Sequence, residues 1–327
     1  MILKEDIGAR LGTSFDSLPE AAACGLPVYR GKVRDVVRGK DLLLLVASDR
    51  ISAFDRVLST VPFKGEILAR VSAWWFSRCA DIVANHVVQG GTPEELGGTG
   101  RACLVRRAEM IPVEVVVRGY LAGSAWRDYH EGRPVSGIEL PEGLSMNEKF
   151  PVPLITPSTK EEGAHDRPLS REEIVAEGIL EEDRWAEIER VSVALFRRGQ
   201  ELAARAGLIL VDTKYEFGIL DGGLVLADEI HSPDSSRYWW EDSYETLFLA
   251  KESQRELDKE PFRRWLLAQG FRGEGPAPAI PDEVRVETAW RYIQAYEAIT
   301  GEEFRPLSSD PQSESAELAR IVSERLR

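Results

Sequence analysis

Residues 208–230 constrain the fold of this 327-residue chain more than any other segment. Two runs of strand-forming residues flank Asp221-Gly222-Gly223, a sequence typical of a tight turn, so the segment predicts a β-hairpin. Successive side chains of a strand point to opposite faces. The first strand therefore presents Asp212, Lys214 and Glu216 on one face. Its other face is mostly apolar and carries Val211, Thr213, Tyr215, Phe217 and Ile219. We expect the apolar face to join the core and the charged face to be available for chemistry.

The acidic residues Glu216 and Asp228 of this hairpin predict a cation site. With a three-residue loop at 221–223, Glu216 lies directly opposite Asp228. Two facing carboxylates repel, so one must take up a proton or a cation must lie between them. Oxygen ligands beside Lys214 suit Mg²⁺ bound together with nucleotide phosphates. The alternative is an exposed polar hairpin face, and a register shift of one residue would remove the direct opposition.

Two other segments carry cations in places that suit phosphate. Lys32 and Arg34 share one face of a predicted strand, and Gly31 lets the backbone approach a ligand closely. A solvated strand face would have the same pattern. Arg118 ends another predicted strand, just before a glycine-containing turn and Ser124. A helix beginning at Ser124 would bind anions at its N-terminus, although Ser124 could equally be a plain helix cap.

Residues 228–237 (DEIHSPDSSR) follow the hairpin and concentrate polar groups in one turn. The hydroxyl groups of Ser232 and its serine neighbours, together with the guanidinium of Arg237, suit a phosphate group. A turn built by Pro233 and Asp234 explains part of the same pattern.

Composition excludes several classes of partner. The formal net charge is -14, from 55 acidic residues against 41 Lys and Arg, which disfavours nucleic acid and anionic membranes as partners. The three cysteines have no metal-ligand spacing, and their odd number argues against a disulfide framework. No apolar stretch approaches the roughly 20 residues of a spanning helix, and the N-terminus lacks a signal-peptide pattern, so we expect a cytoplasmic protein. Neither a P-loop nor a strand-linked dinucleotide-binding glycine motif is present.

The remaining chain predicts an α+β protein of two lobes. Residues 29–47 predict a hairpin, 65–84 a helix, and 102–107 and 113–117 two strands. Pro112 should interrupt strand pairing, which places a hinge at residues 108–112 between a β-rich lobe (1–110) and a larger α+β lobe (111–327). Residues 137–168 contain many helix and strand breakers and predict a long lid-like loop. Helices are expected over 183–206 and 282–300, followed by a charged tail.

Five blocks of the sequence resemble the SAICAR synthetase family, the phosphoribosylaminoimidazole-succinocarboxamide synthases. They are residues 31–35 (GKVRD), 48–55 (SDRISAFD), 117–124 (VRGYLAGS), 211–218 (VDTKYEFG) and 228–237 (DEIHSPDSSR). The resemblance extends from residue 31 to about residue 265. Two positions depart from the family pattern: Val37 replaces an aromatic residue, and the loop at Ala164-His165-Asp166 lacks the family's glycine and asparagine.

The resemblance implies a two-lobed, ATP-grasp-like fold and an ATP-dependent ligase. The reaction would join the ribotide 5-amino-1-(5-phosphoribosyl)imidazole-4-carboxylate (CAIR) to L-aspartate, through an acyl phosphate, giving SAICAR, ADP and phosphate. ATP would bind between the lobes, with adenine near Glu109 and Met110. The phosphates would be held by Lys32 and Arg34. Mg²⁺ would be held by Glu216 and Asp228.

The same resemblance assigns the substrate site. The ribotide would be held by Arg118, Ser124, Ser232 and Arg237. Lys160 would bind substrate from a lid after Ser145, together with Lys149, Ser158 and His165. Asp212 or Asp234 would accept the proton of the attacking amine, and Lys214 would neutralise developing charge. A small-molecule kinase and a nucleotide-binding regulatory module are the alternatives, and the sequence does not indicate an oligomeric state.

Overall fold

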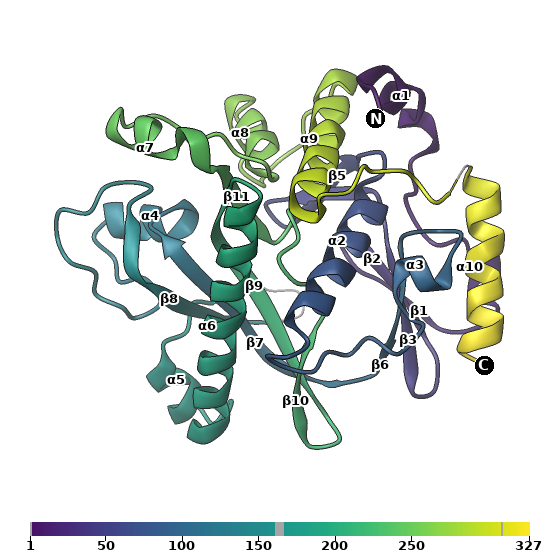
Figure 1. The fold of residues 1–327 in the computed structure, drawn as a ribbon, viewed down its shortest axis with the longest axis horizontal. Coiled ribbons are helices and arrows are strands. Elements are labelled where there is room, and N and C mark those ends of the chain that lie inside the picture. The colour runs from purple at the N-terminus through teal and green to yellow at the C-terminus, as the bar shows by residue number, and fades with distance from the viewer. Residues whose placement is uncertain (1, 161–166, 309) are drawn as a thin grey trace.

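The computed structural model describes residues 2–160, 167–308 and 310–327. Its described part is an α+β fold built on two antiparallel sheets (Figure 1). The smaller sheet has the order β1 (Val28–Arg30), β2 (Arg34–Arg38), β3 (Leu42–Ala47) and β6 (Ala102–Arg106). The larger sheet has the order β10 (Gly223–Ala227), β9 (Leu208–Leu220), β7 (Glu109–Tyr120) and β8 (Lys149–Thr159), and β11 (Ser236–Trp240) also pairs with β9. A ribbon of β4 (Arg50–Ala53) and β5 (Arg56–Thr60) stands beside them. The predicted fold class, with its β-rich N-terminal part, is confirmed.

The hairpin of β9 and β10 is confirmed, but its predicted register is wrong. The turn has two residues, Asp221 and Gly222, and both have positive φ (51° and 80°), as a type I′ turn requires. Gly223 is therefore already paired, and Glu216 faces Ala227 instead of Asp228. Asp228 follows the end of β10 with a φ of 62°, so the chain has left the strand at this residue.

Strand β7 runs through the predicted hinge. Met110 pairs with Gly218 of β9 and Glu114 pairs with Glu216, so four steps along β7 match two along β9. The extra residues form a bulge around Pro112, whose nitrogen cannot donate to the sheet. Pairing is thus interrupted at Pro112 as predicted, although the strand continues.

The predicted long loop over 137–168 is only partly correct. Residues 149–159 form β8, which pairs with β7 despite prolines at 151, 153 and 157. Strand β8 lies at the edge of the larger sheet, and an edge strand tolerates prolines because one row of its amide groups has no partner strand. The tertiary pairing with β7 therefore overrides the local signal for a loop.

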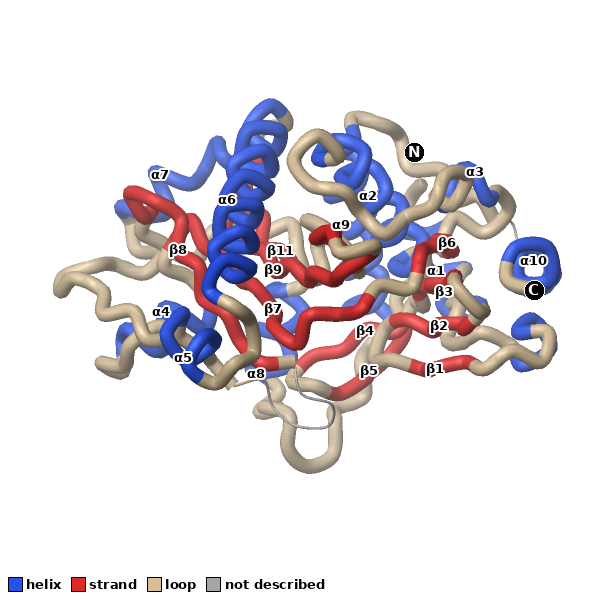
Figure 2. The backbone as a smooth tube through the Cα atoms, turned by 90° about the horizontal axis from the view of Figure 1, so that it is seen from below, coloured by secondary structure: helices blue, strands red, loops and turns tan. Residues whose placement is uncertain are grey.

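Helices cover the sheets (Figures 1 and 2). Helix α6 (Glu182–Arg205) lies along the apolar face of the larger sheet, where Trp185, Ile188 and Leu195 share one core with Tyr215 and Phe217 of β9. Helix α2 (Lys64–Cys79) lies between the two sheets and contributes Trp75 to the same core. The predicted helix over 282–300 is α9 (Asp282–Thr300). The remaining helices are α1 (Lys4–Ala9), α3 (Pro93–Leu96), α4 (Gly123–His130), α5 (Arg171–Ala176), α7 (Glu241–Leu249), α8 (Glu260–Ala268) and α10 (Pro311–Arg325), with 3₁₀ turns at Leu11–Thr13 and Glu20–Ala23. None of the described helices is both long and apolar enough to cross a membrane.

Residues 84–88 join the two sheets through backbone hydrogen bonds. The amide of Leu226 in β10 donates to the carbonyl of Ala84 (2.9 Å), and the amide of His86 donates to the carbonyl of Leu226 (3.2 Å). On its other side the carbonyl of His86 accepts from the amide of Arg106 in β6 (2.8 Å). This segment fixes the edge of one sheet against the edge of the other.

The charged C-terminal tail is a packed helix. Helix α10 lies against the outer side of the smaller sheet (Figure 1), with Leu318, Ile321 and Val322 in one cluster with Val37 and Leu44. Its Glu314 forms a buried ion pair with Arg101, next to β6 (2.6 Å between Nε and Oε1). The charged residues that suggested a tail lie mostly on the other side of the helix.

We predict that Leu318→Ala lowers the free energy of unfolding by about 2–5 kcal/mol, because Leu318 is fully buried and its loss leaves a cavity. Urea unfolding would measure the change. The control Ser323→Ala, at an exposed position of α10, should stay within about 0.5 kcal/mol of the wild type. Equal stabilities for the two variants would show that α10 does not pack on the sheet.

Candidate active site

The charged face of the larger sheet is assembled by the pairing of β7 with β9. In this register Arg118 faces Asp212, Val116 faces Lys214, and Glu114 faces Glu216. Directly opposed residues of antiparallel strands point to the same side of the sheet. The three charged residues that the hairpin pattern placed on one face therefore meet two more from β7.

A pocket with an empty volume of about 690 Å³ opens over this face. Its walls come from the two central strands, from α4, from residues 233–237 and from the start of α8. The basic side chains of the pocket are Arg118, Arg127, Lys214, Arg237, Lys259 and Arg263, against the acidic Asp212, Asp234, Asp258 and Glu260. Six basic against four acidic groups make the pocket locally positive in a protein of net charge -14. Such a pocket suits an anionic small molecule.

Arg118, Ser124 and Arg237, predicted to bind one substrate, line this pocket together. Arg118 Nη2 donates to Ser124 Oγ (3.0 Å), and Arg237 Nη1 donates to Asp212 Oδ2 (2.6 Å). Helix α4 is capped at Ala122, so Ser124 lies in its first turn and is not the helix cap. Gly123 has a φ of 60°, which favours glycine, and a Cβ atom there would lie 2.6 Å from the Arg237 guanidinium, so a larger residue would displace this guanidinium.

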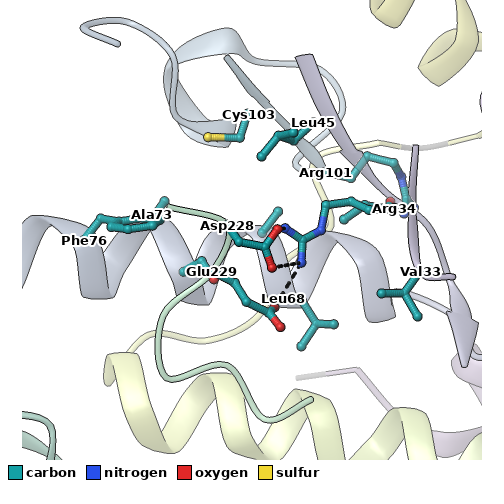
Figure 3. A pocket seen from close by; sticks show the side chains of 13 residues that line it. Val33, Arg34, Leu45, Leu68, Ala73, Phe76, Arg101, Cys103, Asp228 and Glu229 are labelled. Atoms are coloured by element: carbon teal, nitrogen blue, oxygen red, sulfur yellow. Dashed lines mark hydrogen bonds and ion pairs between the residues drawn. The ribbon is translucent and has the colours of Figure 1, made fainter. Parts of the chain in front are cut away.

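A second pocket, of about 480 Å³, lies between the smaller sheet and α2 (Figure 3). Its wall is mostly apolar, with Leu45 and Cys103 from the sheet and Leu68 and Phe76 from α2. Burial raises the pKa of the Cys103 thiol to about 12, so this cysteine is unreactive at neutral pH. The shape and lining suit a flat, mostly apolar group.

Arg34 crosses from the smaller sheet to the larger one at the edge of the second pocket. Its guanidinium donates to both oxygens of the Asp228 carboxylate and lies 3.5 Å from Glu229 (Figure 3). The ion pair joins a predicted phosphate-binding residue to a predicted metal ligand. Burial acts to lower the pKa of Arg34, but Asp228 and Glu229 raise it overall, so the guanidinium stays charged.

Glu216 lies between Lys160 and Lys214. Burial alone would raise the pKa of Glu216, but the two lysines outweigh it and lower the pKa to about 2. Lys214 also contacts Glu114 (2.5 Å), and these carboxylates raise its pKa although burial opposes them. The Glu216 carboxylate is therefore ionised and held in place at neutral pH.

The carboxylates of Glu216 and Asp228 fit a Mg²⁺ ion bound with a nucleotide. Among the described residues no cluster of three or more metal-binding side chains occurs. Mg²⁺ needs no such cluster, because it usually takes one or two carboxylates and completes its shell with phosphate oxygens and water. Both carboxylates offer oxygen ligands and are already paired with cations, Asp228 with Arg34 and Glu216 with two lysines.

Other predicted site residues lie elsewhere. Ser232 is buried, donates to Glu229 Oε2 (2.9 Å) and does not line the larger pocket over the charged face of the sheet. Lys32 is exposed and paired with Asp55 (2.6 Å). Glu109 and Met110 are exposed on β7 and do not line the apolar pocket. His165 and the altered loop at 164–166 fall outside the described residues.

Sequence reasoning missed three cations of the larger pocket: Arg127, Lys259 and Arg263. Lys259 and Arg263 are four residues apart at the start of α8, a spacing that places both on one side of a helix. That spacing was a usable signal, but many exposed helices carry such pairs.

Comparison with known proteins decides the family. The family model described as SAICAR synthetase matches residues 27–278. A phosphoribosylaminoimidazole-succinocarboxamide synthase of Bacteroides fragilis (strain YCH46) is 47% identical over 284 residues, covering 85% of this chain and 88% of its relative. The chain belongs to the SAICAR synthetase family. The SAICAR synthase of Cytophaga hutchinsonii is 46% identical, with 87% and 91% of the two chains covered.

Solved structures of SAICAR synthetases share the fold. The SAICAR synthase of Saccharomyces cerevisiae complexed with SAICAR has a TM-score of 0.76 and 35% identity, covering 89% of this chain and 99% of its own. A SAICAR synthetase in complex with ADP has a TM-score of 0.64 and 27% identity, with 85% of this chain and 100% of its own covered.

The departure from the family pattern at Val37 is one of packing, because this side chain is fully buried in the core of the smaller sheet.

We predict that Glu216→Gln makes the stability of the protein depend less on pH in the acidic range. The lowered pKa of Glu216 means that its contribution is complete above about pH 4.5 and is lost as pH falls toward about 2. The variant should be less stable at neutral pH and should lose less stability over this interval. Thermal unfolding from pH 7 to pH 2 would measure both effects, with exposed Glu142→Gln as the control that keeps the wild-type profile. A wild-type slope in Glu216→Gln would contradict the assignment.

Proposed function

We propose that this protein is an ATP-dependent ligase that joins CAIR to L-aspartate and releases SAICAR, ADP and phosphate. One observation carries the proposal: in a chain of the SAICAR synthetase family, Asp228 lines an apolar pocket and Glu216 is paired with Lys214 of a separate cationic pocket. A ligase of this kind needs a nucleotide site, a site for an anionic substrate, and charged groups where the two meet. Family relatives bear the name of this reaction, and related structures hold SAICAR or ADP.

The nucleotide is proposed to bind between the two lobes, with the division near residue 110. The apolar pocket beside Leu45 and Phe76 suits the adenine ring, with Glu109 and Met110 at the edge of the lobes. Lys32 and Arg34 would hold the phosphates. Mg²⁺ held by Glu216 and Asp228 would neutralise phosphate charge when it is bound. ATP binding would then exchange the Arg34–Asp228 ion pair for contacts of Arg34 with phosphate.

The ribotide is proposed to occupy the cationic pocket. Arg118, Ser124 and Arg237 offer guanidinium and hydroxyl donors to its 5′-phosphate, and Lys259 and Arg263 add charge on the same wall. Lys160, at the end of β8, reaches Glu216 and would cover the site from the lid side, whereas the buried Ser232 would support the loop from behind.

The chemistry follows from the poor reactivity of a carboxylate. An oxygen of the ribotide carboxylate attacks the γ-phosphorus of ATP, ADP leaves, and an acyl phosphate forms. The amine of L-aspartate then attacks the carbonyl carbon, and the C–O bond to phosphate breaks. Lys214, which lines the cationic pocket and contacts Glu216, neutralises charge on the transferred phosphoryl group.

The attacking amine must lose a proton, because an α-amino group with a pKa of about 8 is mostly protonated at neutral pH. Asp212 and Asp234 both line the pocket and are the proposed acceptors. Burial acts to raise the pKa of Asp234, but Lys259 and Lys64 lower it overall, which makes Asp234 a poor proton acceptor. We therefore propose Asp212 as the first candidate for the proton acceptor.

We also propose that the protein is located in the cytoplasm.

The wild-type protein should release ADP from Mg-ATP only when both CAIR and L-aspartate are present. A coupled ADP assay would measure the rate, and mass spectrometry would detect a product heavier than CAIR by one aspartate less one water. ADP release with CAIR alone, together with a stable phosphorylated product, would favour the small-molecule kinase instead. The absence of any release would favour a nucleotide-binding module.

We predict that Asp212→Asn lowers kcat by roughly 10²–10⁴-fold, the usual contribution of a general base. Steady-state kinetics at saturating substrates would measure the effect. The matched control is Asp242→Asn, which removes an exposed carboxylate paired with Arg255 and should leave kcat unchanged. Undiminished turnover by Asp212→Asn would remove Asp212 from this role and leave Asp234 as the candidate.

A further inference from the structure

One tyrosine hydroxyl and two lysine ammonium groups, from three separate parts of the chain, converge on the carboxylate of Asp234. Lys259 Nζ lies 3.2 Å from Oδ1, Lys64 Nζ lies 3.2 Å from Oδ2, and the Tyr292 hydroxyl donates to Oδ1 at 2.8 Å. Asp234 itself lines the cationic pocket, and its side chain is only 7% exposed. Lys259 lines the pocket too, whereas Lys64 and Tyr292 stand behind the carboxylate and do not line it.

Tyr292 belongs to a helix that the family match does not include. The match ends at residue 278, and Tyr292 lies within α9, Asp282–Thr300. This helix packs against α2 through the main core, which contains Tyr292, Ile293 and Tyr296. Burial and the neighbouring Asp234 raise the pKa of the Tyr292 phenol well above its usual value, so the hydroxyl keeps its proton and donates. A C-terminal helix thus supplies a hydrogen bond to a group in the proposed active site.

Lys64 is the second support. It is the first residue of α2, is fully buried, and lies 6.0 Å from the centre of the Tyr292 ring. Taking an ammonium group out of water is costly unless a partner compensates, and Lys64 forms an ion pair with Asp234. A buried lysine that only filled space would be replaced at lower cost by methionine. Its placement is explained if the ion pair fixes the carboxylate.

We propose that Tyr292 and Lys64 are positioning residues that hold the Asp234 carboxylate in one orientation on the wall of the substrate pocket. The inference rests on the proposed ligase function, because it places the positioned carboxylate in the pocket where CAIR and L-aspartate would meet. Both substrates carry an amino group, and an ionised carboxylate can accept a hydrogen bond from such a group. A carboxylate held by one hydrogen bond and two ion pairs is fixed in one orientation, which is what orienting an amine requires. The C-terminal helix α9 is therefore part of the catalytic apparatus and not only a cover for the core.

The test is Tyr292→Phe, which removes only the hydroxyl and keeps the ring. The matched control is Tyr296→Phe on the same helix. Tyr296 is similarly buried, but its hydroxyl accepts a hydrogen bond from Arg70 (2.7 Å) and does not reach the pocket. In Tyr292→Phe we expect kcat/KM for CAIR or for L-aspartate to fall about tenfold, with KM for ATP within about twofold of the wild type. Tyr296→Phe should lower thermal stability to a similar extent and keep wild-type kinetics.

Two further variants connect the effect to Asp234. Lys64→Met should lower the same kinetic parameter as Tyr292→Phe. In an Asp234→Asn background, Tyr292→Phe should cause less than about a twofold further loss, because residues that act through one group are not additive.

Each outcome separates this inference from the function on which it rests. No ADP release by the wild type with both substrates would end the ligase proposal itself. An active wild type with equal kinetics for Tyr292→Phe and Tyr296→Phe would overturn the positioning role and leave the ligase intact. A Tyr292→Phe variant that loses kcat/KM equally for all three substrates, ATP included, would also overturn it, because that pattern reports general loss of structure.

Discussion

The antiparallel pairing of β7 with β9 is the constraint on which the rest of the site depends. It places Arg118 beside Asp212 and Glu114 beside Glu216, and it puts Lys214 between them on the same face. The opposite face carries Tyr215 and Phe217 into the core under α6. A shift of one residue would turn the charged row into the core and the aromatic row into solvent, so the packing of α6 fixes the register of the charged residues.

Ion pairs that are buried or partly buried recur in the molecule. Arg34 meets Asp228 between the sheets, Lys64 meets Asp234 behind the pocket, and Arg101 meets Glu314 under α10. Replacing such pairs by apolar groups often costs nothing in stability, so stability alone does not explain them. The first two pairs border the proposed nucleotide and substrate sites, where fixed charges are needed to orient phosphates, carboxylates and amines. The third ties the C-terminal helix to the lobe that would hold the nucleotide.

Much of the fold was predictable because its signals are local. Alternation identified the hairpin of β9 and β10, and helical periodicity identified α6 and α9. The prediction failed where tertiary contacts outweigh local signals. Strand β8 exists because β7 pairs with its proline-containing sequence, and Glu216 misses Asp228 because a two-residue turn was shorter than expected. In the site, the residues predicted together are carried by three sequence motifs: Arg118 and Ser124 by the first, Asp212 and Lys214 by the second, and Arg237 by the third. Lys64 and Tyr292 were not predictable, because a lysine at a helix start and a tyrosine in a helical stripe have many ordinary explanations.

The central claim is that this face of the sheet passes a phosphoryl group from ATP to a carboxylate, which an amine then attacks. The most direct measurement uses CAIR labelled with ¹⁸O in both carboxylate oxygens, followed by mass spectrometry of the phosphate released with L-aspartate present. If an acyl phosphate forms, the bond that breaks joins carbon to oxygen, and each released phosphate carries one ¹⁸O atom. Unlabelled phosphate would contradict the account, because it would mean that ATP is hydrolysed without activating the carboxylate.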